Sequence, residues 1–433
     1  MLRQNKNFFD FFAWVMFKLS LDAAYFFVAD RFADYIFFSE TNFNLIKYCE
    51  SWMMLFLIFS LMPRKKIVSS AIIWLLLAVS YVPMLTLYGF LDKPRIYIWA
   101  VTLFWLLVFF LLAIMPRPKL KFLFPRQSVL VCGFIFAAMS FLGMSLLFLG
   151  IKFSINFNLV EVYRVREAFT AAKIFLGGYL FNWLAYVANS FFAVWAVKNK
   201  KWWLLLSVAL SQSIIFFATG NKIFLFSLFL VLGLYFIARR KNVIFLMFGG
   251  FSLVVFLGIA VYYVMGSEWV YFLFTRRFMM VPAQLSYLYY DFFSANPFLF
   301  LSEHGVIKSL FHYSYDMSPG HLIAKTYFNR PETNAVNGIY ADGFMNFGFL
   351  GMALWGCVLS FLLIVADALS RGKSFCFCFA LMAMPAVVFT ESGLLTVMLT
   401  HGFLFALLLL YLAPVETEGY SGNGLLRGSP KNE

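Results

Sequence analysis

Arginines placed beside apolar segments carry the most evident chemistry in this sequence. Arg164 and Arg166 precede an apolar run that starts near Ile174, and Arg276-Arg277 lie in a longer polar stretch. A guanidinium group binds two phosphate oxygens at once, so arginines at a membrane edge suit a lipid-linked phosphate. The alternative is a surface helix with ordinary ion pairs, whose arginines reach towards lipid head groups.

Residues 266–342 form the only long run in the sequence that a lipid core could not hold. The run contains His304, His312 and His321, at spacings of eight and nine residues. These spacings differ from those of zinc-binding histidines, so we expect no metal site. His321 is a candidate general base or hydrogen-bond donor, with a structural role as the alternative.

An aromatic run follows the arginine pair of this stretch. Tyr289 and Tyr290 lie beside Asp291 within it. Aromatic rings stack on the faces of sugar rings, and carboxylates bind sugar hydroxyls, so the run predicts contact with a glycan. The alternative is an amphipathic helix in the membrane interface, where aromatic residues form a belt.

The end of the polar stretch is rich in glycine where the chain returns to the membrane. The glycines allow a sharp re-entry and close helix packing; they are Gly338, Gly343, Gly348 and Gly351. Asn337 and Asp342 are the polar residues nearest the membrane here, which makes them candidates for function. The alternative is that they cap the helix that follows.

A short polar break, Thr219-Gly220-Asn221-Lys222, divides the apolar segment 202–238. Both ends of this segment are basic, so the chain has to enter the membrane and return. Thr, Gly and Asn supply the turn that the return requires. Lys222 lies where it could reach a phosphate.

Composition indicates what kind of protein positions these residues. Hydrophobic residues make up 63% of the chain and charged residues 12%, compared with about 45–50% and 25% in soluble domains. We therefore expect an all-α polytopic membrane protein, with residues 1–433 in one integral membrane domain. The basic residues lie in short clusters between apolar runs, which indicates topology signals and lipid contact, with no nucleic acid partner.

Apolar runs predict about twelve membrane-spanning helices. They lie near 8–28, 44–62, 67–88, 96–115, 129–150, 174–197, 202–218, 223–238, 243–265, 343–366, 375–391 and 394–412. Five short basic loops then fall on one side, which the positive-inside rule makes cytoplasmic. The opposite, periplasmic side carries a smaller segment, 152–173, and the large loop 266–342. The polar tail 415–433 is expected to be cytoplasmic and disordered.

At this level of pattern the chain resembles the Wzy-type O-antigen polymerases, which join oligosaccharide repeat units. The resemblance rests on Tyr163-Arg164-Val165-Arg166-Glu167, Ala218-Thr219-Gly220-Asn221-Lys222, Arg276-Arg277 through Tyr289-Tyr290-Asp291-Phe292-Phe293, and Asn337 with Asn346-Phe347-Gly348-Phe349-Leu350-Gly351. Ten residues separate Arg166 from Gly177, similar to the arginine-x10-glycine pattern of these polymerases, although Arg276 starts no second copy. Val336 stands where the related O-antigen ligases have histidine, which favours a polymerase.

The resemblance implies an inverting, metal-independent glycosyltransferase of the bacterial inner membrane, GT-C-like in fold and without a cofactor. Its donor is a glycan on undecaprenyl pyrophosphate, its acceptor is one repeat unit on the same carrier, and its further partners are membrane lipid and a chain-length regulator protein. An O-antigen ligase and a flippase for lipid-linked oligosaccharide stay open as alternatives.

Within this interpretation each candidate residue has a role. Pyrophosphate binding is expected at Arg164, Arg166, Arg276, Arg277 and Lys222, with Arg166 and the later arginine pair serving separate substrates. Sugar stacking is expected at Tyr289 and Tyr290, and catalysis at His321, Asp342 and Asn337. The general base stays open among His321, Asp342 and Glu332.

Overall fold

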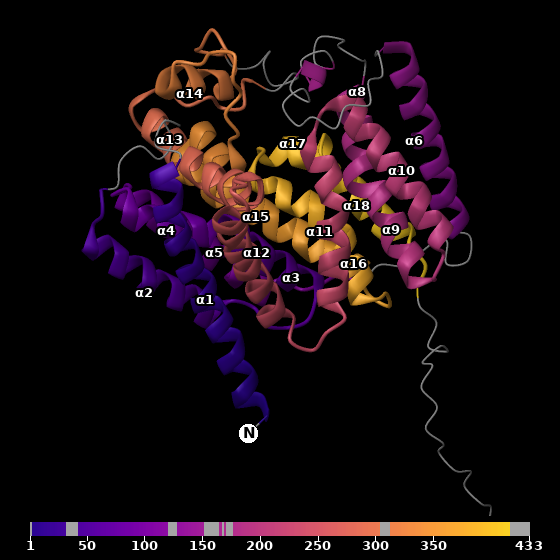
Figure 1. The fold of residues 1–433 in the computed structure, drawn as a ribbon, viewed down its shortest axis with the longest axis horizontal. Helices are drawn as coiled ribbons and strands as arrows, with labels where there is room; N and C mark the ends of the chain where they lie inside the picture. Colours follow the sequence, from indigo (N-terminus) through magenta and orange to yellow (C-terminus); the bar gives the residue numbers. More distant parts are fainter. Residues whose placement is uncertain are drawn as a thin grey trace, which may run out of the picture.

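The computed structural model describes residues 2–31, 42–119, 128–150, 164–166, 169, 176–303 and 312–415. Within these ranges the regular elements are helical, apart from one isolated β-bridge between Asn42 and Leu91. The helices pack side by side in one bundle, with α14 beyond one end of it (Figure 1). The prediction of an all-α fold is confirmed. His304, most of 152–173 and residues 416–433 lie outside the described ranges.

One to three consecutive helical elements correspond to each of the twelve predicted segments. The first six segments correspond to α1 (Leu2–Arg31), α2 (Leu45–Leu61), α3 (Val68–Leu76) with η1 (Leu77–Tyr81) and α4 (Val82–Phe90), α5 (Arg95–Ile114), α6 (Ser128–Gly150), and α8 (Gly177–Asn182) with η2 (Trp183–Ala188) and α9 (Asn189–Lys198). The others correspond to α10 (Trp202–Thr219), α11 (Lys222–Ala238), α12 (Val243–Met265), α15 (Gly338–Leu369), α16 (Phe375–Val387) with η5 (Val388–Thr390), and α17 (Leu394–Leu399) with α18 (Phe403–Leu412).

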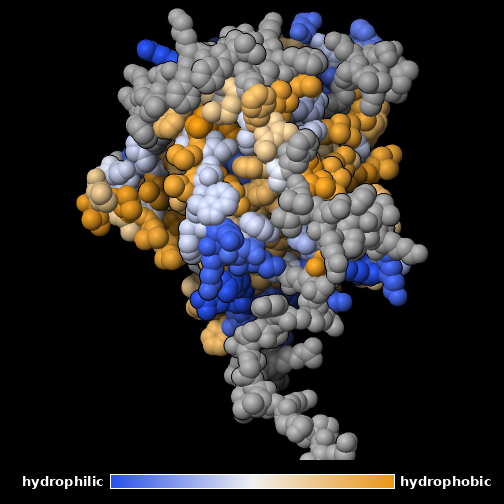
Figure 2. Space-filling view, turned by 90° about the vertical axis from the view of Figure 1, so that its right-hand side faces the viewer, coloured by the Kyte–Doolittle hydropathy of each residue, from blue (hydrophilic) through white to orange (hydrophobic). Residues whose placement is uncertain are grey.

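Seven of the described helical segments are long and apolar enough to cross a membrane. They are Val68–Phe90, Arg95–Ile114, Gly177–Lys198, Trp202–Thr219, Val243–Met265, Gly338–Leu369 and Leu394–Leu412. Figure 2 shows hydrophobic surface across the middle of the molecule and hydrophilic surface gathered below it. This distribution matches a bilayer around the bundle, because lipid tails contact apolar side chains without cost. The fold is that of an all-α polytopic membrane protein.

Much of the 266–342 stretch is helical and packs on the bundle. It contains the π-helical segment η3 (Tyr271–Met280), α13 (Val281–Ala295) and α14 (Pro319–Phe328). η3 packs on α12, where a Cβ added at Gly258 would lie 3.0 Å from the Cα of Tyr271. α13 packs on α15 and α4, and Tyr287 on it is fully buried. The sequence predicted one large loop here, but its first half covers the bundle because it carries many apolar and aromatic residues.

Helix α15 contains a sharp bend at the glycine-rich run. Gly348 has a φ of +62°, a backbone conformation that glycine adopts without strain. The bend brings the two parts of the helix into contact, since a Cβ added at Gly351 would lie 2.0 Å from the carbonyl oxygen of Gly343. The predicted close packing of these glycines is confirmed. α15 begins at Gly338, before the predicted start at residue 343, so Asp342 lies inside the helix.

A buried ion pair lies within α1, the first helix of the bundle. The Lys18 Nζ and Asp22 Oδ1 atoms are 2.5 Å apart, and both side chains are almost fully buried. The same carboxylate accepts hydrogen bonds from Thr86 Oγ1 at 2.8 Å and from the Tyr48 hydroxyl at 3.0 Å. Buried charges are tolerated when they are paired and hydrogen-bonded, so this cluster holds α1 against α2 and α4.

Candidate functional site

A cavity of about 1130 Å³ opens where the ends of several helices meet. Its walls come from η3, α11, α12 and α16, from the 391–401 region, and from the segments 318–320 and 334–337. Pockets for small ligands usually measure about 300–1,000 Å³, so this cavity can hold a large ligand. Several of the residues singled out from the sequence line it.

The turn between α10 and α11 places Lys222 on the cavity wall. Gly220 ends α10 in the left-handed conformation with a φ of +64°. The Thr219 hydroxyl accepts a hydrogen bond from the Asn221 backbone N–H at 3.3 Å. The predicted turn is therefore confirmed. Lys222 begins α11, and its Nζ atom lies 5.4 Å from the centroid of the Trp269 ring.

The adjacent arginines of η3 point to different surroundings. Arg276 is buried, with its guanidinium 5.0 Å from the centroid of the Phe272 ring, and it does not line the cavity. Arg277 lines the cavity, and neither a hydrogen bond nor an ion pair joins it to another described residue. An arginine that lines a cavity and makes no hydrogen bond or ion pair with another described residue is suited to an anionic ligand.

In the 164–166 segment, too, only one of the two arginines lines the cavity. Both arginines are exposed, but only Arg166 lines the cavity. The structure therefore brings Arg166, Lys222 and Arg277 to one cavity from three separate segments. Clustered cations with apolar walls around them bind an anion more strongly than the same cations do in bulk water.

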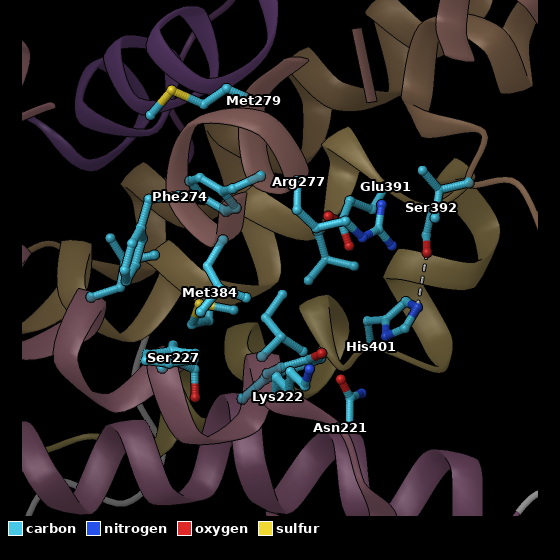
Figure 3. Close-up of a pocket in the computed structure, with 18 of the residues that line it drawn as sticks. Asn221, Lys222, Ser227, Phe274, Arg277, Met279, Met384, Glu391, Ser392 and His401 are labelled. Carbon is cyan, nitrogen blue, oxygen red and sulfur yellow. Dashed lines mark hydrogen bonds between the residues drawn. The ribbon is translucent and has the colours of Figure 1, made fainter. Parts of the chain in front are cut away.

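Polar residues that the sequence analysis did not select complete this end of the cavity. Glu391, Ser392 and His401 gather near Arg277, with Asn221 and Lys222 facing them (Figure 3). Ser392 Oγ and His401 Nε2 are 3.1 Å apart, and His401 Nδ1 is buried with no hydrogen-bond partner among the described residues. The sequence feature that could have identified this region is the polar break at residues 390–393, between two apolar runs.

Glu303 also lines the cavity. Its segment is held on α15 by hydrogen bonds from Leu299 N to Met345 O, at 2.9 Å, and from Leu301 N to Asn346 Oδ1, at 2.8 Å. Burial, and to a smaller extent the nearby carboxylate of Asp342, raises the pKa of Glu303 to about 7. A carboxyl group that titrates near neutral pH can take a proton from a reacting hydroxyl.

Asp342 lies next to the cavity and supports its wall. Its carboxylate accepts hydrogen bonds from Trp355 Nε1 at 2.5 Å and from the backbone N–H of Leu394 at 2.8 Å. It therefore caps the N-terminus of α17 and not that of its own helix. A Cβ added at Gly393 would lie 2.5 Å from Asp342 Oδ1, so this approach requires glycine. Asp342 thus holds in place the segment that carries Glu391 and Ser392.

The other predicted catalytic residues take different positions. Asn337 lines the cavity at the start of α15, and its side chain makes no capping hydrogen bond. His321 on α14 does not line the cavity, and its Nδ1 atom is 2.8 Å from the carbonyl oxygen of Pro331. Glu332 is exposed and also lies off the wall. Of the four residues that the sequence suggested for catalysis, His321, Glu332, Asn337 and Asp342, only Asn337 lines the cavity.

The two tyrosines predicted to stack on sugars are largely used by the protein itself. Tyr289 lines the cavity but is buried, and its hydroxyl donates to the carbonyl oxygen of Ala335 at 2.9 Å. Tyr290 stacks on Tyr97 with ring centroids 4.7 Å apart and is not part of the wall. The aromatic surface of the cavity comes mainly from other rings, among them Tyr186, Phe226, Phe272, Phe274 and Phe278.

The described residues contain no group of three or more His, Cys, Asp or Glu side chains placed to hold a metal ion. No protein family model, curated protein or solved structure matches this chain. The class of protein is therefore defined by its own fold and site. It is an all-α polytopic membrane protein whose large cavity is lined by charged and polar residues at one end and by apolar residues along the rest.

Proposed function

We propose that this chain is an inverting glycosyltransferase that polymerises undecaprenyl-pyrophosphate-linked oligosaccharide repeat units into O-antigen or a related surface polysaccharide. The observation that carries the proposal is the convergence of Arg166, Lys222 and Arg277 on one cavity with long apolar walls. A ligand that combines a multiply charged phosphate head with a hydrocarbon chain satisfies both parts of this cavity. The resemblance of the sequence to Wzy-type polymerases supports the same substrate.

The transfer reaction requires positive charge at the leaving group and a proton acceptor, and the polar end of the cavity contains residues of both kinds. An acceptor sugar hydroxyl attacks the anomeric carbon of the donor, and the bond from that carbon to the pyrophosphate oxygen breaks with inversion. The pyrophosphate leaves as an anion, so cations that neutralise its charge lower the barrier. In this proposal Arg277, Arg166 and Lys222 provide the charge, and Glu303, which lines the same cavity, receives the hydroxyl proton.

The proposal includes a topology of twelve membrane-spanning helices with a GT-C-like arrangement. The polar end of the cavity then faces the periplasm, and the basic loops face the cytoplasm of a bacterial inner membrane. Alkaline phosphatase fused after Ser302 is expected to be active, and alkaline phosphatase fused after Arg371 to be inactive. The reverse pattern would overturn the orientation.

The test of the function is the glycan made by a deletion strain. Deletion is expected to leave a single repeat unit on the lipid core, and the wild-type gene to restore the ladder of longer chains. The Arg277→Ala gene at equal protein level is expected not to restore it. Loss of all repeat units from the lipid core would indicate a ligase, and an unchanged ladder would refute both activities.

A further inference from the structure

The cavity continues from its polar end into an apolar groove between two helices. α11 lines it from Ile223 to Ile237, and α12 lines it from Met247 to Val254. At 1.5 Å per helical residue, the lining on α11 extends over about 21 Å. The hydroxyl of Ser227 in this stretch donates within its own helix, to Phe224 O at 2.7 Å, so it adds no free polar group.

Two glycines keep the groove wide. Gly233 on α11 and Gly250 on α12 both line it, and a Cβ added to either would meet no atom within 4 Å. Close helix packing therefore does not explain these glycines, in contrast to Gly258 on the same α12, where an added Cβ would lie 3.0 Å from Tyr271. Any larger side chain at Gly233 or Gly250 would occupy the groove itself.

The groove is open to the apolar surface of the bundle. α11 packs mainly on α16 and only lightly on α12, so the two groove walls are not pressed together. Phe229 lines the groove and is 69% exposed, and Leu253 on α12 is also largely exposed. A hydrocarbon chain can therefore enter from the lipid side, and an apolar groove gains free energy when such a chain displaces water.

We infer that the groove between α11 and α12 binds the polyprenyl chain of one lipid-linked substrate, whose phosphate lies at Arg166, Lys222 and Arg277. This inference rests on the proposed function. One cavity joins the end with the three cations to the apolar groove, so a single amphiphile can occupy both. The three cations then serve a single pyrophosphate, whereas the sequence analysis assigned Arg166 and the later arginine pair to separate substrates.

Binding measurements on the purified full-length chain in detergent test the inference without any sugar or turnover. The probes are undecaprenyl phosphate and inorganic pyrophosphate. Gly233→Phe and Gly250→Leu fill the groove and are expected to weaken undecaprenyl phosphate binding at least tenfold, with pyrophosphate binding unchanged. Gly249→Leu is the matched control, because Gly249 is equally open but does not line the cavity. Thermal unfolding checks that each variant is folded.

Equal undecaprenyl phosphate affinity in wild type, Gly233→Phe and Gly250→Leu would overturn the inference, as would an equal loss in Gly249→Leu. Displacement of undecaprenyl phosphate by an equal concentration of phosphatidylglycerol would assign the groove to an ordinary phospholipid and also overturn it. If the groove variants weaken undecaprenyl phosphate binding but the wild-type protein forms no polymer from lipid-linked repeat units, the proposed function is refuted and the groove assignment is not. Polymer formation at the wild-type rate in the groove variants would refute the groove assignment alone.

Discussion

Replacement of Arg277 tests most directly whether the cationic cavity binds the leaving group. Arg277 lines the cavity and has no hydrogen bond or ion pair with another described residue, so its replacement breaks no such bond within the described residues. A hydrogen bond between charged groups contributes about 1.5–3 kcal/mol, and each 1.4 kcal/mol corresponds to a tenfold change in rate. Arg277→Ala is therefore expected to lower polymerisation about ten- to 150-fold at normal protein level. Arg277→Lys keeps the charge but not the planar fork, and it is expected to recover part of the loss.

The assay is the rate of polymer formation by purified protein from lipid-linked repeat units, expressed per molecule of folded enzyme. Arg164→Ala is the control, because Arg164 is exposed and does not line the cavity, and it is expected to change the rate less than twofold. The neighbouring Arg276 is buried against Phe272, so Arg276→Ala is expected to lower the amount of folded protein. Full activity of Arg277→Ala, or an equal loss in Arg164→Ala, would refute the assignment.

Three further predictions follow from the described contacts. Burial raises the pKa of Glu303 to about 7, so the folded state keeps this proton to higher pH than the unfolded chain, in which the carboxyl has its ordinary pKa of 4.5. The polymerisation rate is therefore expected to rise with pH through about 7, and this rise is expected to disappear in Glu303→Gln. The free energy of unfolding is expected to fall as the pH rises from 4.5 to about 7, because the unfolded chain loses the proton first. A rise that persists in Glu303→Gln would refute its role as base. Gly393→Ala places a methyl group 2.5 Å from the Asp342 carboxylate and is expected to lower stability by about 1–3 kcal/mol in a thermal unfolding experiment, unlike Gly249→Ala. Asp22→Ala leaves Lys18 buried without its counter-ion and is expected to lower the free energy of unfolding by about 3–5 kcal/mol. The double variant Lys18→Met/Asp22→Leu removes both charges and is expected to recover part of this loss. Equal stability of Asp22→Ala and the double variant would contradict the importance of the ion pair.

Local sequence patterns predicted the class of protein and the positions of its helices. Hydropathy is a property of consecutive residues, so each apolar run could be assigned to a helix without knowledge of its neighbours. The turn at Gly220 was predicted for the same reason, because it depends on backbone preferences of a few adjacent residues. The glycine-rich run predicted a sharp re-entry and close packing, but the predicted helix 343–366 did not include the bend at Gly348. The start of α15 was placed too late, because the turns before its bend contain the polar residues Asp342 and Asn346, which are buried against protein.

Packing in three dimensions decided which candidates belong to the cavity. The sequence treats Arg276 and Arg277 alike, but successive helical residues point in different directions, and η3 turns Arg277 alone towards the cavity. Glu303 and His401 lie in segments far apart along the chain, and the packing of α15 and the 391–401 region brings both to the cavity wall. Asp342 shows the same limit, because its partners Trp355 and Leu394 approach it only after α15 bends at Gly348. Sequence alone therefore determined a membrane protein with polar groups suited to a phosphate, and the tertiary structure decided which of these groups meet.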